Sequence, residues 1–326
     1  MKVKYFIILL IFIFFGCTKK EAPVVSEKTV SGYGAYYYNL SKQEQYSEQQ
    51  RIDFINKAFS SASKLKNNKA SRNLLSDIVF QYYNFGMADE FNNSSKLLLK
   101  NSLVVSDTIN LGKAYRSRAT HFQNVNSLDS SFIYFSKAEK LYFKLSNEQQ
   151  VLANIYLNKG VVQCMASDFL GAELSLSKAY SIYKDSDNSE KLYGTLNQLG
   201  LVYNELKEYD KAVFYHTKAL ETVRKFKLQN AQHQEAVCYN NLGYLYIKQN
   251  KYREAITNFE LALKDKGIIK DDKDLYSLLI DNLAYSRLQS SNYEGLPDLF
   301  FEALKIRQEL KDPTVIVGSY IHISEY

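Results

Sequence analysis

Leu199 to Ala212 reads LGLVYNELKEYDKA, and Leu242 to Ala255 reads LGYLYIKQNKYREA. Counted from the glycine of each stretch, both carry Tyr at positions +3 and +9 and Ala at position +12. Beyond the quoted letters, both continue with an aromatic ring at +16 and Ala at +19. Agreement at so many fixed positions indicates an internal repeat, in which one supersecondary unit recurs along the chain.

The same frame extends over most of the sequence. Its central position falls at residues 79, 119, 160, 200, 243 and 284, so successive copies are 40 to 43 residues apart. The best-matching copies share the signature positions Gly160, Ala172, Ala179, Leu199, Gly200, Tyr203, Tyr209, Ala212, Ala219, Leu242, Gly243, Tyr246, Tyr252, Ala255, Phe259 and Ala262. We interpret each copy as two helices that approach closely at their small residues and bury their apolar faces by stacking on neighbouring pairs. The expected fold is an all-α solenoid.

Composition agrees with this interpretation. The chain has only 13 Gly and 3 Pro in 326 residues, which disfavours turn-rich β folds. Its formal charge is +6, and removing the two lysines of the first four residues leaves 39 basic residues against 35 acidic ones. This balance is too even to predict binding to nucleic acid.

The pattern resembles the tetratricopeptide repeat, and the copy around Gly243 matches nearly every signature position of that family. The resemblance implies a right-handed superhelical array over residues 71–326, with a degenerate helix pair at 33–70. The usual period of this family is about 34 residues, whereas the copies here average 41. The difference predicts longer helices or longer connections.

The resemblance also implies a binding face. In this family the first helix of each pair lines a concave groove, through residues three before and one, four and five after the central position. Carried over to this chain, these positions give Arg116, Gln123, Leu157, Val161, Met165, Asn197, Leu201, Asn204, Asn240, Tyr244, Lys248 and Tyr285, with Cys164, Asp281 and Gln289 beside them. An apolar centre with amide and tyrosine side chains around it suits an extended peptide or a helix of another protein. The alternative is that much of this strip packs on neighbouring helices.

Some members of the family capture a C-terminal carboxylate with a lysine three before the central position and an asparagine one after it. No copy in this chain has either residue at its place. Capture of a chain terminus is therefore not expected.

The first sixteen residues have the three parts of an export signal. Two lysines precede an apolar run from Tyr5 to Phe15, and Gly16 follows. A helix of eleven residues covers about half of a bilayer core, so this run is not a transmembrane anchor. We expect a signal peptide at residues 1–16.

Cys17 directly follows this run, and the junction resembles a bacterial lipobox, in which the cysteine is acylated and becomes the mature N-terminus. Phe14 and Phe15 depart from the usual leucine and small residue of that motif. We expect a lipid on Cys17, a flexible tether over 17–32 and a lipid-anchored protein of the cell envelope that faces the periplasm. An ordinary signal peptide with an incidental Cys17 is the alternative.

No cluster of residues points to catalysis, to a cofactor or to a metal. The four histidines lack metal-binding spacing, and His216 occupies a core ring position of the repeat, where we expect it to be packed. Phosphate-binding loops, dinucleotide fingerprints and nucleophile elbows do not occur in the sequence. Cys164 and Cys238 lie two copies apart, too far for a disulfide. We expect a non-catalytic protein that binds another protein or a peptide.

Three functional classes remain open. Val315 to Tyr326 has the pattern of a first helix without its second, so we expect a fragment of a longer protein, with an unusual natural terminus as the alternative. The chain then resembles the N-terminal part of bacterial tetratricopeptide signalling proteins, which continue into a transmembrane helix and a sensor histidine kinase or helix-turn-helix output domain. The second class is a free-standing lipoprotein adaptor for complex assembly. The third is a glycan-binding lipoprotein of the starch-utilisation type, which the even spacing and the absence of Trp disfavour.

Overall fold

The computed structural model describes residues 30–311 and 313–326, and the regular structure within these ranges is helical. The leader, Cys17 and most of the predicted tether lie outside the described residues. The chain divides into two compact units, Met1–Ile78 and Val79–Tyr326, with the division inside helix α3 (Lys69–Asn84). Helices packed in sequential pairs confirm the predicted all-α fold.

The first unit contains α1 (Val30–Ser41), α2 (Glu48–Ala62) and the beginning of α3. Helix α1 packs on α2, and Gly34 lies where a Cβ atom would be 3.0 Å from the Leu74 side chain. Ser47 caps α2 by accepting a hydrogen bond from the Gln50 backbone N–H, while the Gln50 side chain accepts one from Ser47. Residues 30–32, which the sequence analysis assigned to the tether, belong to α1.

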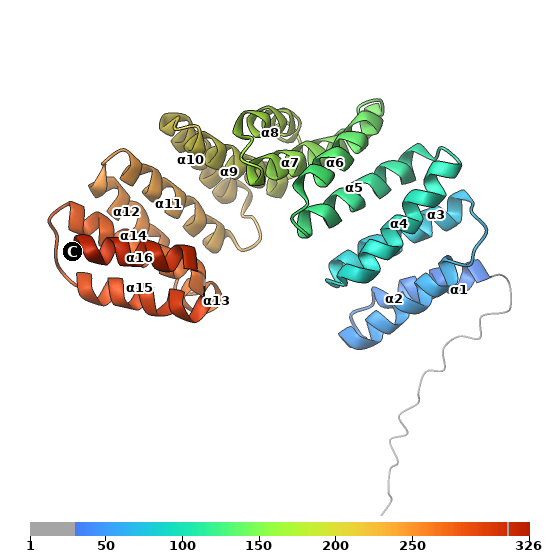
Figure 1. Ribbon diagram of the computed structural model, residues 1–326, viewed down its shortest axis with the longest axis horizontal. Coiled ribbons are helices and arrows are strands. Elements are labelled where there is room, and N and C mark those ends of the chain that lie inside the picture. The colour runs from blue at the N-terminus through green and yellow to red at the C-terminus, as the bar shows by residue number, and fades with distance from the viewer. Residues whose placement is uncertain (1–29, 312) are drawn as a thin grey trace, which may run out of the picture. The chain divides into compact units, whose positions relative to one another are not determined.

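The second unit continues α3 and then alternates first and second helices (Figure 1). The order is α4 (Ala88–Val104), α5 (Thr108–Asn124), α6 (Leu128–Tyr142), the 3₁₀ turn η1 (Ser146–Glu148), α7 (Gln149–Met165), α8 (Phe169–Tyr183), α9 (Ser189–Glu205), α10 (Tyr209–Phe226), α11 (Ala231–Lys248), α12 (Tyr252–Ala262), α13 (Ile268–Asp271), α14 (Lys273–Gln289), α15 (Leu296–Leu310) and α16 (Pro313–Glu325). The predicted repeat centres at 119, 160, 200, 243 and 284 fall on α5, α7, α9, α11 and α14.

Glycine at the centre of a first helix is explained by the close approach of its partner. A Cβ atom on Gly160 would lie 2.7 Å from Leu176 Cγ, and one on Gly243 would lie 2.6 Å from Phe259 Cε1. The signature alanines of the second helices are at most 1% exposed, which lets the backbones meet. Small residues at the crossing points and large ones beside them therefore position each pair.

A left-handed residue recurs in the connection from first to second helix. Asn126, Ser167, Lys207, Asn250 and Ser291 all have φ between 55° and 61°. A residue in this conformation reverses the chain within a few residues after a helix C-terminus. The second helices therefore return antiparallel to the first.

Helix length accounts for the long period. Helices α9 and α10 contain 17 and 18 residues, and they are joined by a short turn. Extra residues thus extend the helices and the faces that they present. Among the described residues, no helix combines the length and the apolar character needed to cross a membrane.

Candidate functional site

Three large apolar side chains remain partly exposed on consecutive first helices. Met165 of α7 is 47% exposed, Leu201 of α9 is 38% exposed and Tyr244 of α11 is 36% exposed. All three occupy positions that the sequence analysis assigned to the binding face. Val161 is half-buried beside them, whereas Leu157 is 8% exposed and belongs to the core.

Several polar candidates bond to the neighbouring first helix. The Arg116 guanidinium donates to Asn154 Oδ1 at 3.0 Å, which ties α5 to α7. Gln123 Nε2 lies 3.8 Å from the Met165 sulfur, also across α5 and α7. On the other side, the Asn241 amide donates to Asn197 Oδ1 at 3.0 Å and joins α11 to α9. These side chains therefore brace the face as well as line it.

Two asparagines keep an amide oxygen without a bond. The Oδ1 atoms of Asn204 and Asn240 are buried and have no hydrogen-bond partner within the described part of the chain. The Asn204 amide nitrogen donates to Glu205 Oε1 at 3.2 Å, so its orientation is held while its oxygen is left over. A buried acceptor without a donor is costly, so both amides are held in place at a cost to stability.

Lys248 carries a positive charge on this face. Its Nζ lies 4.8 Å from the centre of the Tyr244 ring, and a hydrogen bond to Tyr244 raises the pKa of Lys248. Cys164 precedes Met165 on α7 and is half-buried, and this burial raises the pKa of its thiol to about 11. The lysine is thus held as a cation, and the thiol stays protonated at neutral pH.

The C-terminal side of the predicted face is closed by α16. Asp281 is only 1% exposed, and one of its oxygens lies 2.9 Å from Arg307 Nη1 and 2.8 Å from His322 Nδ1. The Tyr285 ring stacks on His322 at 4.3 Å, and Gln289 donates to Glu325. The sequence interpretation of Asp281 as an exposed groove residue is therefore wrong, because the next helix packs over it.

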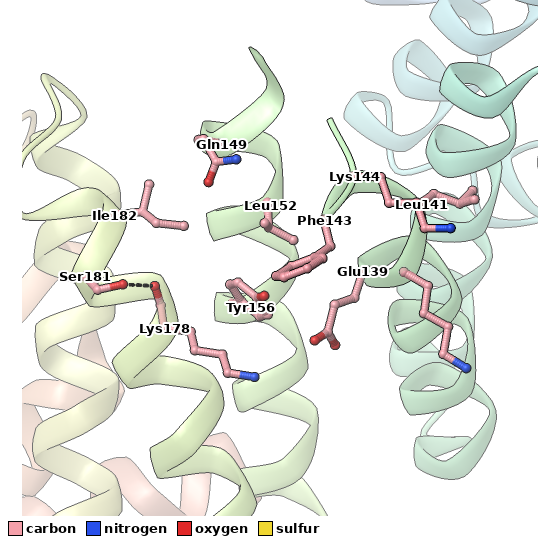
Figure 2. A pocket seen from close by; sticks show the side chains of 11 residues that line it. Glu139, Leu141, Phe143, Lys144, Gln149, Leu152, Tyr156, Lys178, Ser181 and Ile182 are labelled. Carbon is pink, nitrogen blue, oxygen red and sulfur yellow. Dashed lines mark hydrogen bonds between the residues drawn. The ribbon is translucent and has the colours of Figure 1, made fainter. Parts of the chain in front are cut away.

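A cavity that the sequence analysis did not predict lies between α6, α7 and α8. Its volume is about 830 Å³, and Figure 2 shows Phe143, Leu152 and Tyr156 around its centre, with Lys178 at its edge. Its lysines occupy ordinary surface positions of their own helices, so no local signal in the sequence marks them as a group. Among the described residues, no cluster of His, Cys, Asp and Glu is suited to hold a metal ion.

The histidine at the repeat's core ring position is packed as expected. His216 is 1% exposed and its ring faces Gly200 of the preceding helix. Burial lowers the pKa of His216 to about 4. The two cysteines of the described residues are unbridged: Cys164 lies in α7 and the buried Cys238 in α11.

Comparison with known proteins agrees with the repeat assignment. The family model of the tetratricopeptide repeat matches residues 192–265, the segment that contains both quoted stretches. The chain is 30% identical over 143 residues to the anaphase-promoting complex subunit CDC16 of Saccharomyces cerevisiae. This match covers 44% of the chain and 15% of CDC16, so the chain spans only a small part of that relative.

Solved structures share the fold over most of both chains. The apo form of RapI superposes with a TM-score of 0.67 at 15% identity, covering 87% of this chain and 77% of RapI. The apo quorum sensor NprR from B. thuringiensis gives a TM-score of 0.64 at 13% identity, with 90% and 80% covered. NprR in complex with its cognate peptide NprX gives 0.54 at 13% identity, with 91% and 83% covered. The described part of the chain is therefore all-α, and its residues 192–265 match the tetratricopeptide repeat.

Proposed function

We propose that this protein binds an extended peptide or a helix of another protein across the first helices α7, α9 and α11. The observation that carries the proposal is the set of three partly exposed apolar residues, Met165, Leu201 and Tyr244, at the same face of consecutive repeats. Covering apolar surface of this kind is the main favourable contribution to protein association. A peptide with large apolar side chains is the ligand that gains most from it.

The polar groups of the face fit the backbone of such a ligand. Lys248 is a donor for a carbonyl or a carboxylate, whereas the buried Oδ1 atoms of Asn204 and Asn240 become acceptors for peptide N–H groups only when their side chains turn outward. The solved complex of NprR with its peptide, which has the same fold, supports peptide binding as the use of this architecture. Its low identity to this chain leaves the ligand's sequence to be found by experiment.

Selection from a phage library of random peptides against the full chain tests the proposal. Enriched peptides are then synthesised, labelled with fluorescein and titrated by fluorescence anisotropy. Leu201→Glu and Tyr244→Glu are expected to weaken binding by at least tenfold, because each places an unpaired carboxylate against an apolar ligand side chain. Phe301→Glu is the matched control, since Phe301 is 58% exposed on α15, outside the face.

The proposal fails if the selected peptides bind the Leu201 and Tyr244 variants as tightly as the parent. Circular dichroism of every variant separates loss of binding from loss of fold. A weakening in the Phe301 variant equal to that in the other two also counts against this face, because it would show that any surface carboxylate disturbs the interaction.

We further propose that this binding serves an extracytoplasmic sensory or interaction role at the cell envelope. The support is the export signal and the lipobox-like Cys17, together with the resemblance to signalling proteins. Metabolic labelling with an alkynyl fatty acid is expected to tag the parent and not Cys17→Ser. An immunoblot of the native protein distinguishes the two roles: a band well above 37.6 kDa favours the sensory part of a longer protein, and a band near it favours an adaptor.

A further inference from the structure

The cavity between α6, α7 and α8 is a second candidate binding site, separate from the first-helix face. Its volume of about 830 Å³ lies within the range of roughly 300–1,000 Å³ that is usual for ligand pockets. Leu152 and Tyr156 of α7 form buried surface at its base, and Ile182 of α8 completes one side. Phe143, directly after α6, is 71% exposed and lies against the cavity in Figure 2. The interior is thus an open apolar hollow with room for a large apolar side chain and the residues beside it.

The charge around this interior is positive. Lys140 lies in the last turn of α6, Lys144 lies two residues after the end of that helix, and Lys178 belongs to α8; all three are exposed. Glu139, the acidic residue of the lining, bonds to Lys159 Nζ at 2.6 Å, which neutralises it within the protein. Lys178 Nζ lies 5.2 Å from the centre of the Tyr156 ring, so cation and apolar surface adjoin. A ligand with carboxylates on both sides of an apolar group complements this arrangement.

A repeated pair of residues extends the surface along the second helices. In α6, α8 and α10, an exposed apolar residue is followed four residues later, one helical turn on, by a lysine: Ile133 and Lys137, Leu174 and Lys178, Phe214 and Lys218. The apolar members are 51%, 58% and 51% exposed. Helices α6 and α8 both line the cavity, and the Tyr180 and Tyr215 rings join α8 to α10 at 6.3 Å. The corresponding position of the next repeat is Thr257, so the apolar pattern ends there.

We propose that this outer surface binds an acidic segment of a partner protein, which inserts an aromatic or large aliphatic side chain into the cavity and places carboxylates against Lys140, Lys144 and Lys178. A hollow between two helices is complementary to a protruding side chain, whereas a bilayer surface offers no such protrusion. The positive edge excludes basic segments by repulsion and attracts acidic ones over about 10 Å at ordinary salt. The lining of this site shares no residue with the first-helix face, which would allow the protein to join two partners.

The test uses the full chain and a defined probe, the fluorescein-labelled peptide Asp-Glu-Asp-Phe-Asp-Glu-Asp, followed by fluorescence anisotropy. Saturable binding that weakens with added salt is expected. Replacing the central Phe of the probe by Ala, or its acidic residues by Lys and Arg, is expected to abolish measurable binding. The triple variant Lys140→Glu, Lys144→Glu, Lys178→Glu is expected to weaken binding about tenfold or more, since three exposed ion pairs contribute roughly twofold each before repulsion is added.

The matched control is Lys264→Glu, Lys305→Glu, Lys270→Glu, which changes the net charge equally at exposed lysines outside the cavity. The proposal is overturned if this control weakens binding as much as the cavity variant, or if the Phe and Ala probes bind alike. Sedimentation with phosphatidylglycerol vesicles is measured in parallel. Vesicle binding that is lost in the cavity variant, without binding of the acidic probe, would assign the surface to a membrane and would also overturn it. Leu201→Glu is expected to leave the acidic probe's affinity unchanged.

Discussion

Replacing Gly200 by alanine tests the close approach of the helix pair α9 and α10. Gly200 occupies the centre of its repeat, and the His216 ring lies directly against it. A Cβ atom at residue 200 would be 2.6 Å from both Cδ2 and Cε1 of that ring. The ring cannot turn away into solvent, because His216 is 1% exposed. The helices must therefore separate, or the ring must leave its rotamer.

The size of the effect follows from two opposing contributions. Forcing additional atoms into a packed core lowers the free energy of unfolding by about 1–3 kcal/mol, and the short contact between this Cβ atom and the His216 ring is expected to cost about 3 kcal/mol. Alanine in place of glycine inside a helix returns about 1 kcal/mol. The net loss of stability is about 2 kcal/mol, which for a domain of this size lowers the melting temperature by roughly 4–8 °C.

Gly194 supplies the control within the same helix. A Cβ atom there would meet no other atom within 4 Å, so Gly194→Ala is expected to gain about 1 kcal/mol and to raise the melting temperature by about 2–4 °C. Both variants are compared with the parent by thermal unfolding, followed by circular dichroism. A Gly200→Ala protein as stable as the parent would refute the packing argument. His216→Ala in that background is expected to show less than additive loss, because it makes room for the added methyl group.

Three other predictions rest on buried groups. The pKa of His216 falls from 6.5 to about 4 in the folded chain. Between pH 6.5 and pH 4 only the unfolded chain binds a proton at this histidine. The free energy of unfolding therefore decreases as the pH drops through this range, by up to about 3 kcal/mol. His216→Phe is expected to remove that decrease in urea titrations from pH 7 to pH 4, and an unchanged pH profile would contradict the assignment. Asp281→Ala leaves the buried Arg307 guanidinium without its carboxylate and is expected to lower the free energy of unfolding by about 3–5 kcal/mol. Hydrogen exchange in α16 should then be faster than in the parent. An exchange rate equal to that of the parent would argue against the bridge. Burial raises the thiol pKa to about 11 for Cys164 and to about 12 for Cys238. Both thiols should therefore react slowly with iodoacetamide at neutral pH, and the fully buried Cys238 should react more slowly than Cys164. Equal alkylation rates of the two cysteines, measured by mass spectrometry, would contradict this order.

The repeat frame was readable because its positions are set by contacts within one pair. Gly200 and His216 are 16 residues apart, and Gly243 and Phe259 repeat that separation, so the same small and large residues recur at the same spacing. Position +16 tolerates an imidazole or a phenyl ring because both fill the space above a glycine. Local periodicity therefore sufficed to predict the helix pairs and the alternation of their packing residues.

Contacts between residues that are far apart in the sequence could not be predicted from the repeat pattern. Asp281 occupies a groove position by its place in the repeat, yet its partners Arg307 and His322 lie 26 and 41 residues farther along. No residue near Asp281 in the sequence indicates these two contacts. The cavity depends in the same way on residues of α6, α7 and α8 that are brought together only in the fold. The start of α1 at Val30 was missed because its two early glycines weaken any helical pattern.

The contrast between braced and unbraced groups on the first-helix face indicates how a ligand would be selected. The Asn197–Asn241 bond already exists in the unbound protein, so a peptide that displaces it exchanges one hydrogen bond for another and gains little. Covering Leu201 removes apolar surface from water at about 25 cal/mol for each Å² and displaces no existing bond. The unbonded oxygens of Asn204 and Asn240 are buried, so they accept a ligand's hydrogen bonds only when the ligand turns these side chains outward. Affinity should therefore depend mainly on the ligand's apolar side chains, and the discrimination among apolar ligands should depend on these two amides.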